Sequence, residues 1–104
     1  MKASFEKKGE TLTVCLDGEL DQHCAAALRK AIDDKVLSES GVRCLIFDMK
    51  RVGFMDSSGI GLILGRYKLM RDRGGKLNLK NTRSVDKLLK LSGVKSLLST
   101  ENRR

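Results

Sequence analysis

The sequence predicts an α/β fold built on a mixed β-sheet with a parallel core and crossover helices. Segments with apolar residues at every second position alternate along the chain with segments whose apolar residues recur every three or four positions. The first two strand-like segments follow each other across Gly9-Glu10, so we expect the sheet to begin with an antiparallel hairpin. Helices separate the later strands, and we therefore expect those strands to be parallel, with right-handed connections.

The expected order of elements is β-β-α-β-α-β-α. Leu12, Val14 and Leu16 occupy every second position of the second strand, and residues 50–55 are expected to form a connecting loop. We predict strands over residues 4–9, 11–18, 42–49 and 76–81, helices over 22–37, 57–73 and 85–93, and a last helical piece over 94–99.

Caps and apolar stripes define the expected helices. Asp21 is the predicted N-cap of the first helix, because its carboxylate can accept backbone N–H bonds, and Ser84 is the predicted cap of the third. Gly74-Gly75 ends the second helix, and residues 99–104 are expected to be a frayed tail. The predicted stripes are Cys24, Leu28, Ala31, Ile32 and Val36 in the first helix, and Ile60, Ile63, Leu64, Tyr67 and Met70 in the second.

The composition indicates a globular protein with reduced thiols. No apolar run approaches the roughly 20 residues needed to cross a bilayer, so we expect a cytoplasmic protein without membrane insertion. The cysteines are odd in number and match no zinc spacing, and Cys15 and Cys44 are expected to be small buried hydrophobes. His23, the single histidine, is expected at a helix start or on the surface. The sequence therefore predicts no metal, no cofactor and no catalytic residue.

Positive charge is concentrated in the second part of the chain. Residues 1–65 carry 9 Lys+Arg against 10 Asp+Glu, a net charge of −1, and residues 66–104 carry 12 against 3, a net charge of +9, which together make the +8 of the chain. The basic part has one aromatic residue, Tyr67, and so lacks a platform for stacking bases. We expect a solvated face or one that attracts an acidic protein, and binding of nucleic acid or an anionic surface is the alternative hypothesis.

Three segments are expected to meet at the carboxyl ends of the parallel strands, where α/β proteins usually place their sites. The first is 17–21, the second is Asp48 with the loop after it, and the third is 56–59, with the sequence Asp-Ser-Ser-Gly. Carboxylates and hydroxyls should therefore share one edge of the sheet.

Several functions compete for residues 56–59. Gly59 and Gly61 open a helix after a strand, but Gly65 comes one residue late for a dinucleotide fingerprint, and the expected acid is absent from the next strand. A nucleophile elbow requires a glycine two residues before its serine, and a P-loop requires Gly-Lys-Ser/Thr; neither is present. These enzyme and nucleotide-binding functions are the weaker hypotheses.

Two further interpretations suit the segment better. Asp56 or Ser57 can cap the helix, while Gly59 and Gly61 allow close approach at its first turn. A serine at this position is also accessible to a kinase, and a helix N-terminus tolerates phosphate through its free N–H groups and dipole. The new charge would crowd Asp56 and repel a docked partner without changing the fold.

The chain resembles the bacterial anti-sigma factor antagonists, the small single-domain STAS proteins. The resemblance covers residues 11–98 and rests on the stretch 54–68, on Gly-Glu-Leu-Asp at 18–21, on Gly74-Gly75 and on the late segment 88–98. Within the family it is most similar to the sporulation branch, whose members oppose an anti-sigma-F factor. The family fold is a mixed sheet with crossover helices, and the resemblance implies a single domain over residues 1–104.

The resemblance implies regulation by partner switching, without enzymatic activity in the chain itself. The unphosphorylated protein would bind an anti-sigma factor that is also an ATP-dependent serine kinase, and binding would free the sigma factor. Carried onto this sequence, the phosphorylated residue is Ser57, and a separate phosphatase would restore it. The partner-binding residues are Asp21, Asp56, Ser58 and Gly59.

Overall fold

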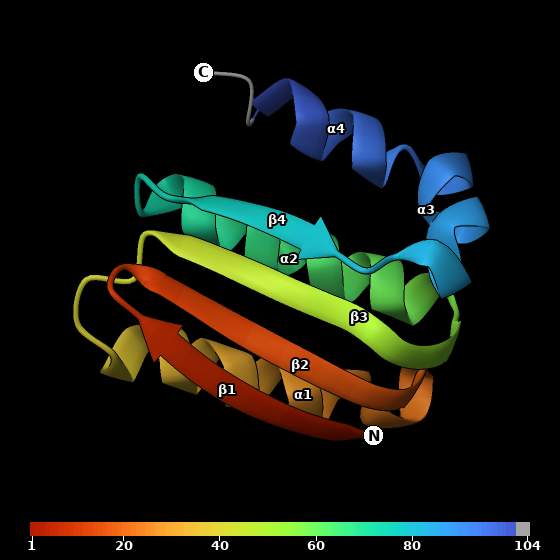
Figure 1. The fold of residues 1–104 in the computed structure, drawn as a ribbon, viewed down its shortest axis with the longest axis horizontal. Helices are drawn as coiled ribbons and strands as arrows, with labels where there is room; N and C mark the ends of the chain where they lie inside the picture. Colours follow the sequence, from red (N-terminus) through yellow and green to blue (C-terminus); the bar gives the residue numbers. More distant parts are fainter. Residues whose placement is uncertain (102–104) are drawn as a thin grey trace.

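The computed structural model describes the backbone of residues 1–101 and the side chains of residues 1–98. It contains one four-stranded sheet in the order β1-β2-β3-β4, in which β1 and β2 are antiparallel and the other pairs are parallel (Figure 1). This confirms the predicted mixed α/β fold. The elements are β1 (Lys2–Lys8), β2 (Thr11–Leu20), α1 (Gln22–Ser38), β3 (Cys44–Met55), α2 (Ser57–Asp72), β4 (Lys76–Lys80), the 3-10 helix η1 (Arg83–Val85), α3 (Asp86–Ser92) and α4 (Val94–Glu101).

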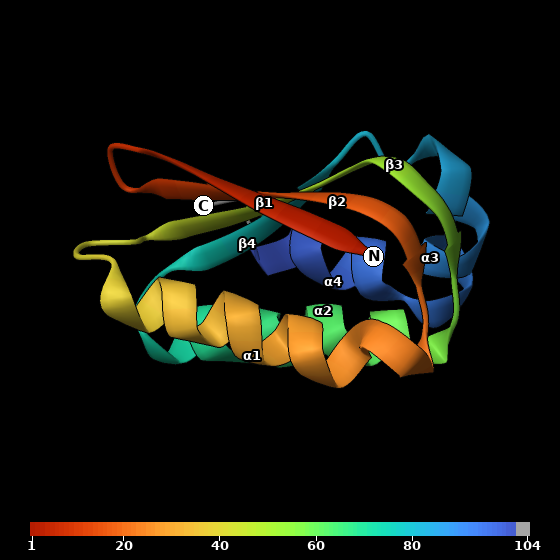
Figure 2. The same cartoon turned by 90° about the horizontal axis from the view of Figure 1, so that it is seen from below.

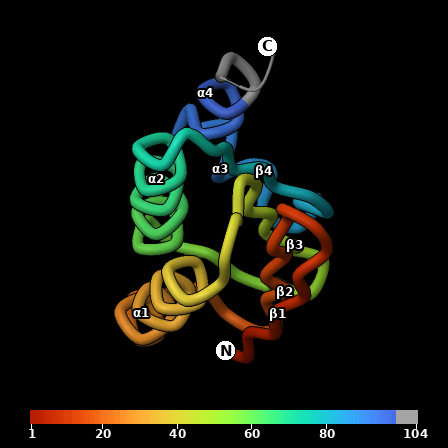
Figure 3. The backbone as a smooth tube through the Cα atoms, turned by 90° about the vertical axis from the view of Figure 1, so that its left-hand side faces the viewer, coloured from red at the N-terminus to blue at the C-terminus, as the bar shows by residue number. Residues whose placement is uncertain are grey.

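The helices cover one face of the sheet and one of its edges. Figure 2 shows α1 and α2 side by side beneath the same face, and no helix of the described residues lies over the other face. Figure 3 shows α4 above the pair of α1 and α2, and α4 contacts β4, the strand at the edge of the sheet. The sheet therefore has a covered and an open face, as the alternation in the second strand predicts.

The core lies between the sheet and the pair α1 and α2. Its central strand, β3, contributes Phe47 and Met49 to the covered face, and both are fully buried. The helices contribute Ile32 from α1 and Ile63 from α2, which are also fully buried. Ala31 and Leu64, which the predicted stripes include, are exposed instead. In α2 the buried face is turned toward Leu62 and Arg66, which the predicted stripe omits.

Strand β3 is longer than the sequence predicts. We expected a loop over 50–55, but the strand continues to Met55 and pairs with β2 up to Leu20. The pairing of the two strands contains a β-bulge in β3: Cys15 and Asp17 of β2 are two residues apart, whereas their partners Asp48 and Arg51 are three residues apart. Lys50 and Arg51 are consequently both exposed, which interrupts the alternation that would mark a strand.

Strand β2 also continues beyond its predicted end. Gly18 lies inside the strand with a φ of +126°, and a Cβ atom there would come within 3.2 Å of the Met1 backbone. Glycine at this position is therefore required by backbone conformation and by close approach, and it does not end the strand.

The third helix begins differently from the prediction. Ser84 is not its cap: Ser84 lies within η1, and its hydroxyl donates to the carbonyl oxygen of Val52 at 2.6 Å. Helix α3 runs from Asp86 to Ser92, and the residue that follows it, Gly93, caps it with a left-handed φ of +80°. Helix α4 runs to Glu101, so its end falls within the expected frayed tail, while residues 102–104 lie outside the described part of the chain.

The prediction of buried cysteines is wrong for two positions. Cys15 is exposed on the open face of β2, and Cys44 is half-buried on the open face of β3. The alternation of β2 overrides the general preference of cysteine for the interior, because its apolar neighbours Leu16 and Val14 take the covered face.

Candidate functional site

The site lies where the adjacent parallel strands β2 and β3 end. Leu20 and Met55, the last residues of the two strands, are paired in the register. Each is followed by an aspartate that caps a helix: Asp21 accepts from His23 N–H at 3.0 Å, and Asp56 accepts from Ser58 N–H at 2.8 Å. The predicted cap Asp21 is thus confirmed, and the cap of the second helix is Asp56 rather than Ser57.

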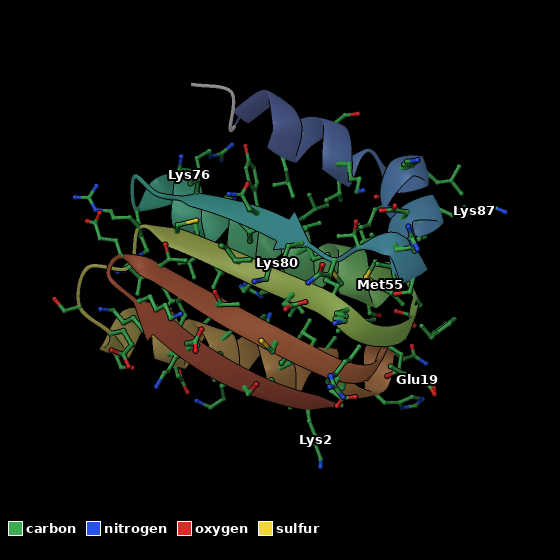
Figure 4. All side chains as sticks on the ribbon, viewed as in Figure 1. Lys2, Glu19, Met55, Lys76, Lys80 and Lys87 are labelled. Atoms are coloured by element: carbon green, nitrogen blue, oxygen red, sulfur yellow. The ribbon has the colours of Figure 1, made fainter. Side chains whose placement is uncertain are left out.

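The starts of α1 and α2 are also joined directly. The backbone N–H of Asp56 donates to the carbonyl oxygen of Leu20 at 3.2 Å. Glu19 is exposed just before this junction, so three carboxylates belong to the same edge. Figure 4 shows Glu19 and Met55 at the same end of the molecule, at the finish of their strands. This acidic edge is formed by Glu19, Asp21 and Asp56.

The two serines differ in their surroundings. Ser57 is the first residue of α2 and is exposed, and its hydroxyl makes no hydrogen bond with the described residues. Ser58 is half-buried, and its backbone N–H is held by Asp56. Ser57 is therefore the hydroxyl more accessible to another protein, next to an N-terminus that favours negative charge.

Gly59 allows the first turn of α2 to lie against the strand ends. A Cβ atom at this buried position would overlap Met55, with its Sδ at 2.8 Å, and would lie 3.0 Å from Leu20 Cγ. The prediction of close approach is wrong for Gly61, which is exposed and has no atom within 4 Å of a Cβ built there. Gly59 is thus a spacing residue of the site, and Gly61 is not.

Asp48 does not belong to this edge. The sequence places it at a strand end, but β3 continues for seven residues beyond it, or about 20 Å of extended chain. Asp48 faces the open side opposite Lys80, which Figure 4 shows near the middle of the sheet. A hydrogen bond from Asn81 at 3.0 Å lowers the pKa of Asp48, and Lys50 N–H adds a second bond at 3.1 Å.

The described residues contain no group of three or more His, Cys, Asp or Glu side chains that could hold a metal ion. His23 is exposed in the first turn of α1, as expected. Within the same described range, the helices are all too short or too polar to cross a membrane.

A family model described as the STAS domain matches residues 2–103. The chain belongs to the STAS domain family. The anti-sigma F factor antagonist of Paenibacillus polymyxa is 35% identical over 95 residues, which are 90% of this chain and 80% of the relative. The anti-sigma-B factor antagonist of Bacillus subtilis (strain 168) is 32% identical over 88 residues, 84% of this chain and 78% of the relative. These matches confirm the resemblance found in the sequence.

A solved structure of a relative supports the same family at the level of the fold. The Bacillus cell fate determinant SpoIIAA in its phosphorylated form is 31% identical and superposes with a TM-score of 0.69, over 91% of this chain and 86% of that chain. STAS proteins of this group are regulatory binding proteins, in agreement with the prediction that the chain is not an enzyme.

Two features of the structure were missed in the sequence, one between α1 and α2 and one beside the site. Arg66 of α2 is buried against Asp33 of α1, with 2.7 Å between Arg66 Nε and Asp33 Oδ1. Phe54 and Leu91 are large apolar residues left exposed next to the site. The helical pattern places an arginine on the surface by default, and only the packing of α1 on α2 reveals its partner.

Proposed function

We propose that the chain is an anti-sigma factor antagonist that binds its partner through the edge where α1 and α2 begin. The proposed partner-binding residues around Ser57 are Asp21, Asp56, Ser58 and Gly59; the buried Gly59 would act by holding the first turn of α2 against the strand ends. Family membership and the two named relatives support this function. The single observation that supports the location best is the exposed Ser57 hydroxyl on the acidic edge, at the first residue of a helix.

Phosphorylation of Ser57 is the proposed off-switch. The partner would transfer the γ-phosphoryl group of ATP to Ser57 Oγ, while the hydroxyl proton passes to a base of the kinase and ADP leaves. The exposure of Ser57, compared with the half-buried Ser58, supports the choice between them. That SpoIIAA, a relative, has been solved in a phosphorylated form supports phosphorylation as such.

Charge explains how the phosphate would release the partner. A phosphoserine adds about −1.5 to −2 charges at neutral pH, directly beside Asp56. For the transfer, the kinase must hold the phosphates of its nucleotide against Ser57, so in a re-formed complex the phosphoserine would face these like charges. At 4 Å, each pair of like charges costs about 1 kcal/mol in water and about 4 kcal/mol near a protein surface. The helix N-terminus compensates part of this cost within the chain, so the fold is retained.

A phosphoserine phosphatase would complete the cycle by hydrolysing the ester and restoring the Ser57 hydroxyl. We further propose that residues 1–104 act as one domain in the cytoplasm, where a sigma factor and a kinase with ATP are found. The chain contributes no catalytic group in this scheme and acts as ligand and substrate.

Calorimetry with the purified anti-sigma factor encoded in the same genome tests the proposal. The wild-type chain should bind, Ser57→Ala should bind with similar affinity, and Ser57→Asp should bind at least tenfold more weakly with an unchanged thermal midpoint. Ser57→Asp carries less charge than a phosphate, so its effect is a lower limit. Absence of wild-type binding, or equal affinity of Ser57→Asp, contradicts the proposal.

Binding of nucleic acid or an anionic surface remains the alternative. The basic residues of the second part of the chain are dispersed: Figure 4 shows Lys76 and Lys87 at opposite ends of the molecule, and Arg66 is buried. Lys95 pairs with Asp86, which further reduces the free positive charge. A dispersed arrangement favours this alternative less than a continuous stripe would.

A further inference from the structure

An apolar groove lies directly beside the acidic edge, between the end of β3 and helix α3. It has a volume of about 310 Å³, a size that suits one or two side chains better than a large cofactor. Phe54 is 50% exposed and Leu91 is 77% exposed. Apolar side chains that line one groove on an otherwise charged surface indicate an interaction site. The lining residues are Gly53, Phe54, Met55, Ser84, Val85, Lys87, Leu88 and Leu91.

The groove is built on a fixed support. The hydrogen bond from Ser84 to Val52 at 2.6 Å holds η1 against β3, and Val85 is buried beneath it. On α3, Leu89 is fully buried and faces the core. Leu91 lies about 200° around the helix from Leu89 and so cannot reach the same interior. The Leu91 side chain therefore does not take part in the packing of this chain.

The charge around the groove is opposite to that of the acidic edge. Arg83, Lys87 and Lys90 are exposed on η1 and α3. Neither Arg83 nor Lys87 forms an ion pair with a carboxylate of the described residues, because the nearby Asp86 pairs with Lys95 and accepts from Thr82. Figure 4 shows Lys87 pointing away from the body of the molecule, at the same end as Met55 and Glu19.

We propose that this groove receives an apolar side chain flanked by carboxylates on the anti-sigma factor. The inference rests on the proposed function and specifies the chemistry of its partner. Met55 lines the groove and directly precedes Asp56, so one partner surface can cover both areas. The partner then meets two adjacent areas of opposite charge, which fixes its orientation on the chain. Phosphate on Ser57 alters the acidic area and leaves the groove available.

Two exposed leucines provide a matched test. Leu91→Asn removes the most exposed apolar wall of the groove, whereas Leu37→Asn makes the same change at a residue that is 61% exposed, in the last turns of α1. By calorimetry with the purified anti-sigma factor from the same genome, Leu91→Asn should weaken binding about tenfold or more, as expected for a central apolar contact. Leu37→Asn should stay within twofold of the wild type.

A second variant tests the charge of the occupant. Lys87→Glu should weaken binding at least fivefold at low salt, and the difference from the wild type should shrink as the salt concentration rises. Both substitutions are at exposed or groove-lining surface positions, and unchanged thermal midpoints will show that the fold is retained.

The outcomes separate the groove from the proposed function. If the wild-type chain binds and Leu91→Asn binds equally well, the groove proposal is overturned while the antagonist function stands. If the wild-type chain does not bind, the groove proposal and the antagonist function are both contradicted. If sedimentation shows a wild-type dimer that Leu91→Asn dissociates, with unchanged affinity for the anti-sigma factor, a second copy fills the groove and the proposal is also overturned.

Discussion

The backbone N–H of Asp56 donates a hydrogen bond to the carbonyl oxygen of Leu20 at 3.2 Å. This bond connects the residue that caps α2 to the residue directly before the cap of α1. Two helix starts that are 35 residues apart in the sequence are therefore held at one edge, Asp21 and Asp56 beside each other along it. A partner that binds there contacts both starts, and a charge added at Ser57 affects the whole edge.

The two glycines of the first turns of α2 should respond oppositely to alanine. Gly59→Ala should lower the free energy of unfolding by about 1–2 kcal/mol, because the new methyl group would overlap Met55 and press on Leu20. Gly61→Ala should raise it by about 0.5–1 kcal/mol, because alanine favours the helix and the space is open. Urea denaturation measures both, and equal effects would contradict the packing described for Gly59.

In the buried pair of Asp33 and Arg66, removal of the aspartate should lower the free energy of unfolding more than removal of the arginine. The pair is close but not linear, so it acts as an ion pair rather than as a directed hydrogen bond. Burial lowers the pKa of Arg66, the Asp33 charge opposes this effect, and Arg29 adds a repulsive contribution. Asp33→Ala should cost about 2–3 kcal/mol, because it leaves a buried cation beside Arg29.

Arg66→Met is the control for this pair. Methionine fills a similar apolar volume, and the remaining Asp33 side chain is 28% exposed, so its charge can be solvated. The expected cost by urea denaturation is about 1 kcal/mol or less. A larger cost for Arg66→Met than for Asp33→Ala would show that the carboxylate, not the guanidinium, is the group that depends on its partner.

The hydrogen bond from Asn81 should make stability depend on pH. It is the main cause that lowers the pKa of Asp48 below the ordinary 3.8. The ionised carboxylate therefore stabilises the fold above pH 3.8, and this contribution is lost as the pH falls from there through the lowered folded-state pKa. Asn81→Gly should cost about 1 kcal/mol at pH 7 and less at pH 2.5. Glycine is the suitable replacement because Asn81 has a φ of +56°.

The charge of Asp56 should matter for binding separately from its cap. Asp56→Asn retains an N-cap acceptor, so the free energy of unfolding should stay within about 0.5 kcal/mol of the wild type. If the acidic edge contacts basic groups of the partner, the same variant should bind the anti-sigma factor several-fold more weakly in calorimetry. Asp56→Ala should in addition lose about 1 kcal/mol of stability. Unchanged affinity in Asp56→Asn would remove this carboxylate from the proposed contacts.

The sequence was sufficient for the parts of the fold that depend on local patterns. The alternation of Leu12, Val14 and Leu16 and the caps at Asp21 and Asp56 are properties of neighbouring residues, and they place the helix starts correctly. Because adjacent parallel strands end at one edge, the meeting of residues 17–21 with 56–59 followed from the topology.

The errors arise where distant parts of the chain decide the outcome. The bulge opposite Cys15 exposes Lys50 and Arg51 together, so the end of β3 has the polar pattern of a loop. Asp48 was consequently assigned to the site. Packing of α1 on α2 buries Arg66, and the return of η1 onto β3 creates the groove beside Leu91; neither has a local signal.

The most direct test of the central claim is to locate the phosphate. The chain is incubated with the purified anti-sigma factor of the same genome and ATP, and the product is mapped by mass spectrometry, with Ser57→Ala and Ser58→Ala as controls. We predict one phosphate on Ser57 in the wild type and in Ser58→Ala, and none in Ser57→Ala. Phosphate on Ser58, or no phosphate on the wild-type chain, would contradict the account.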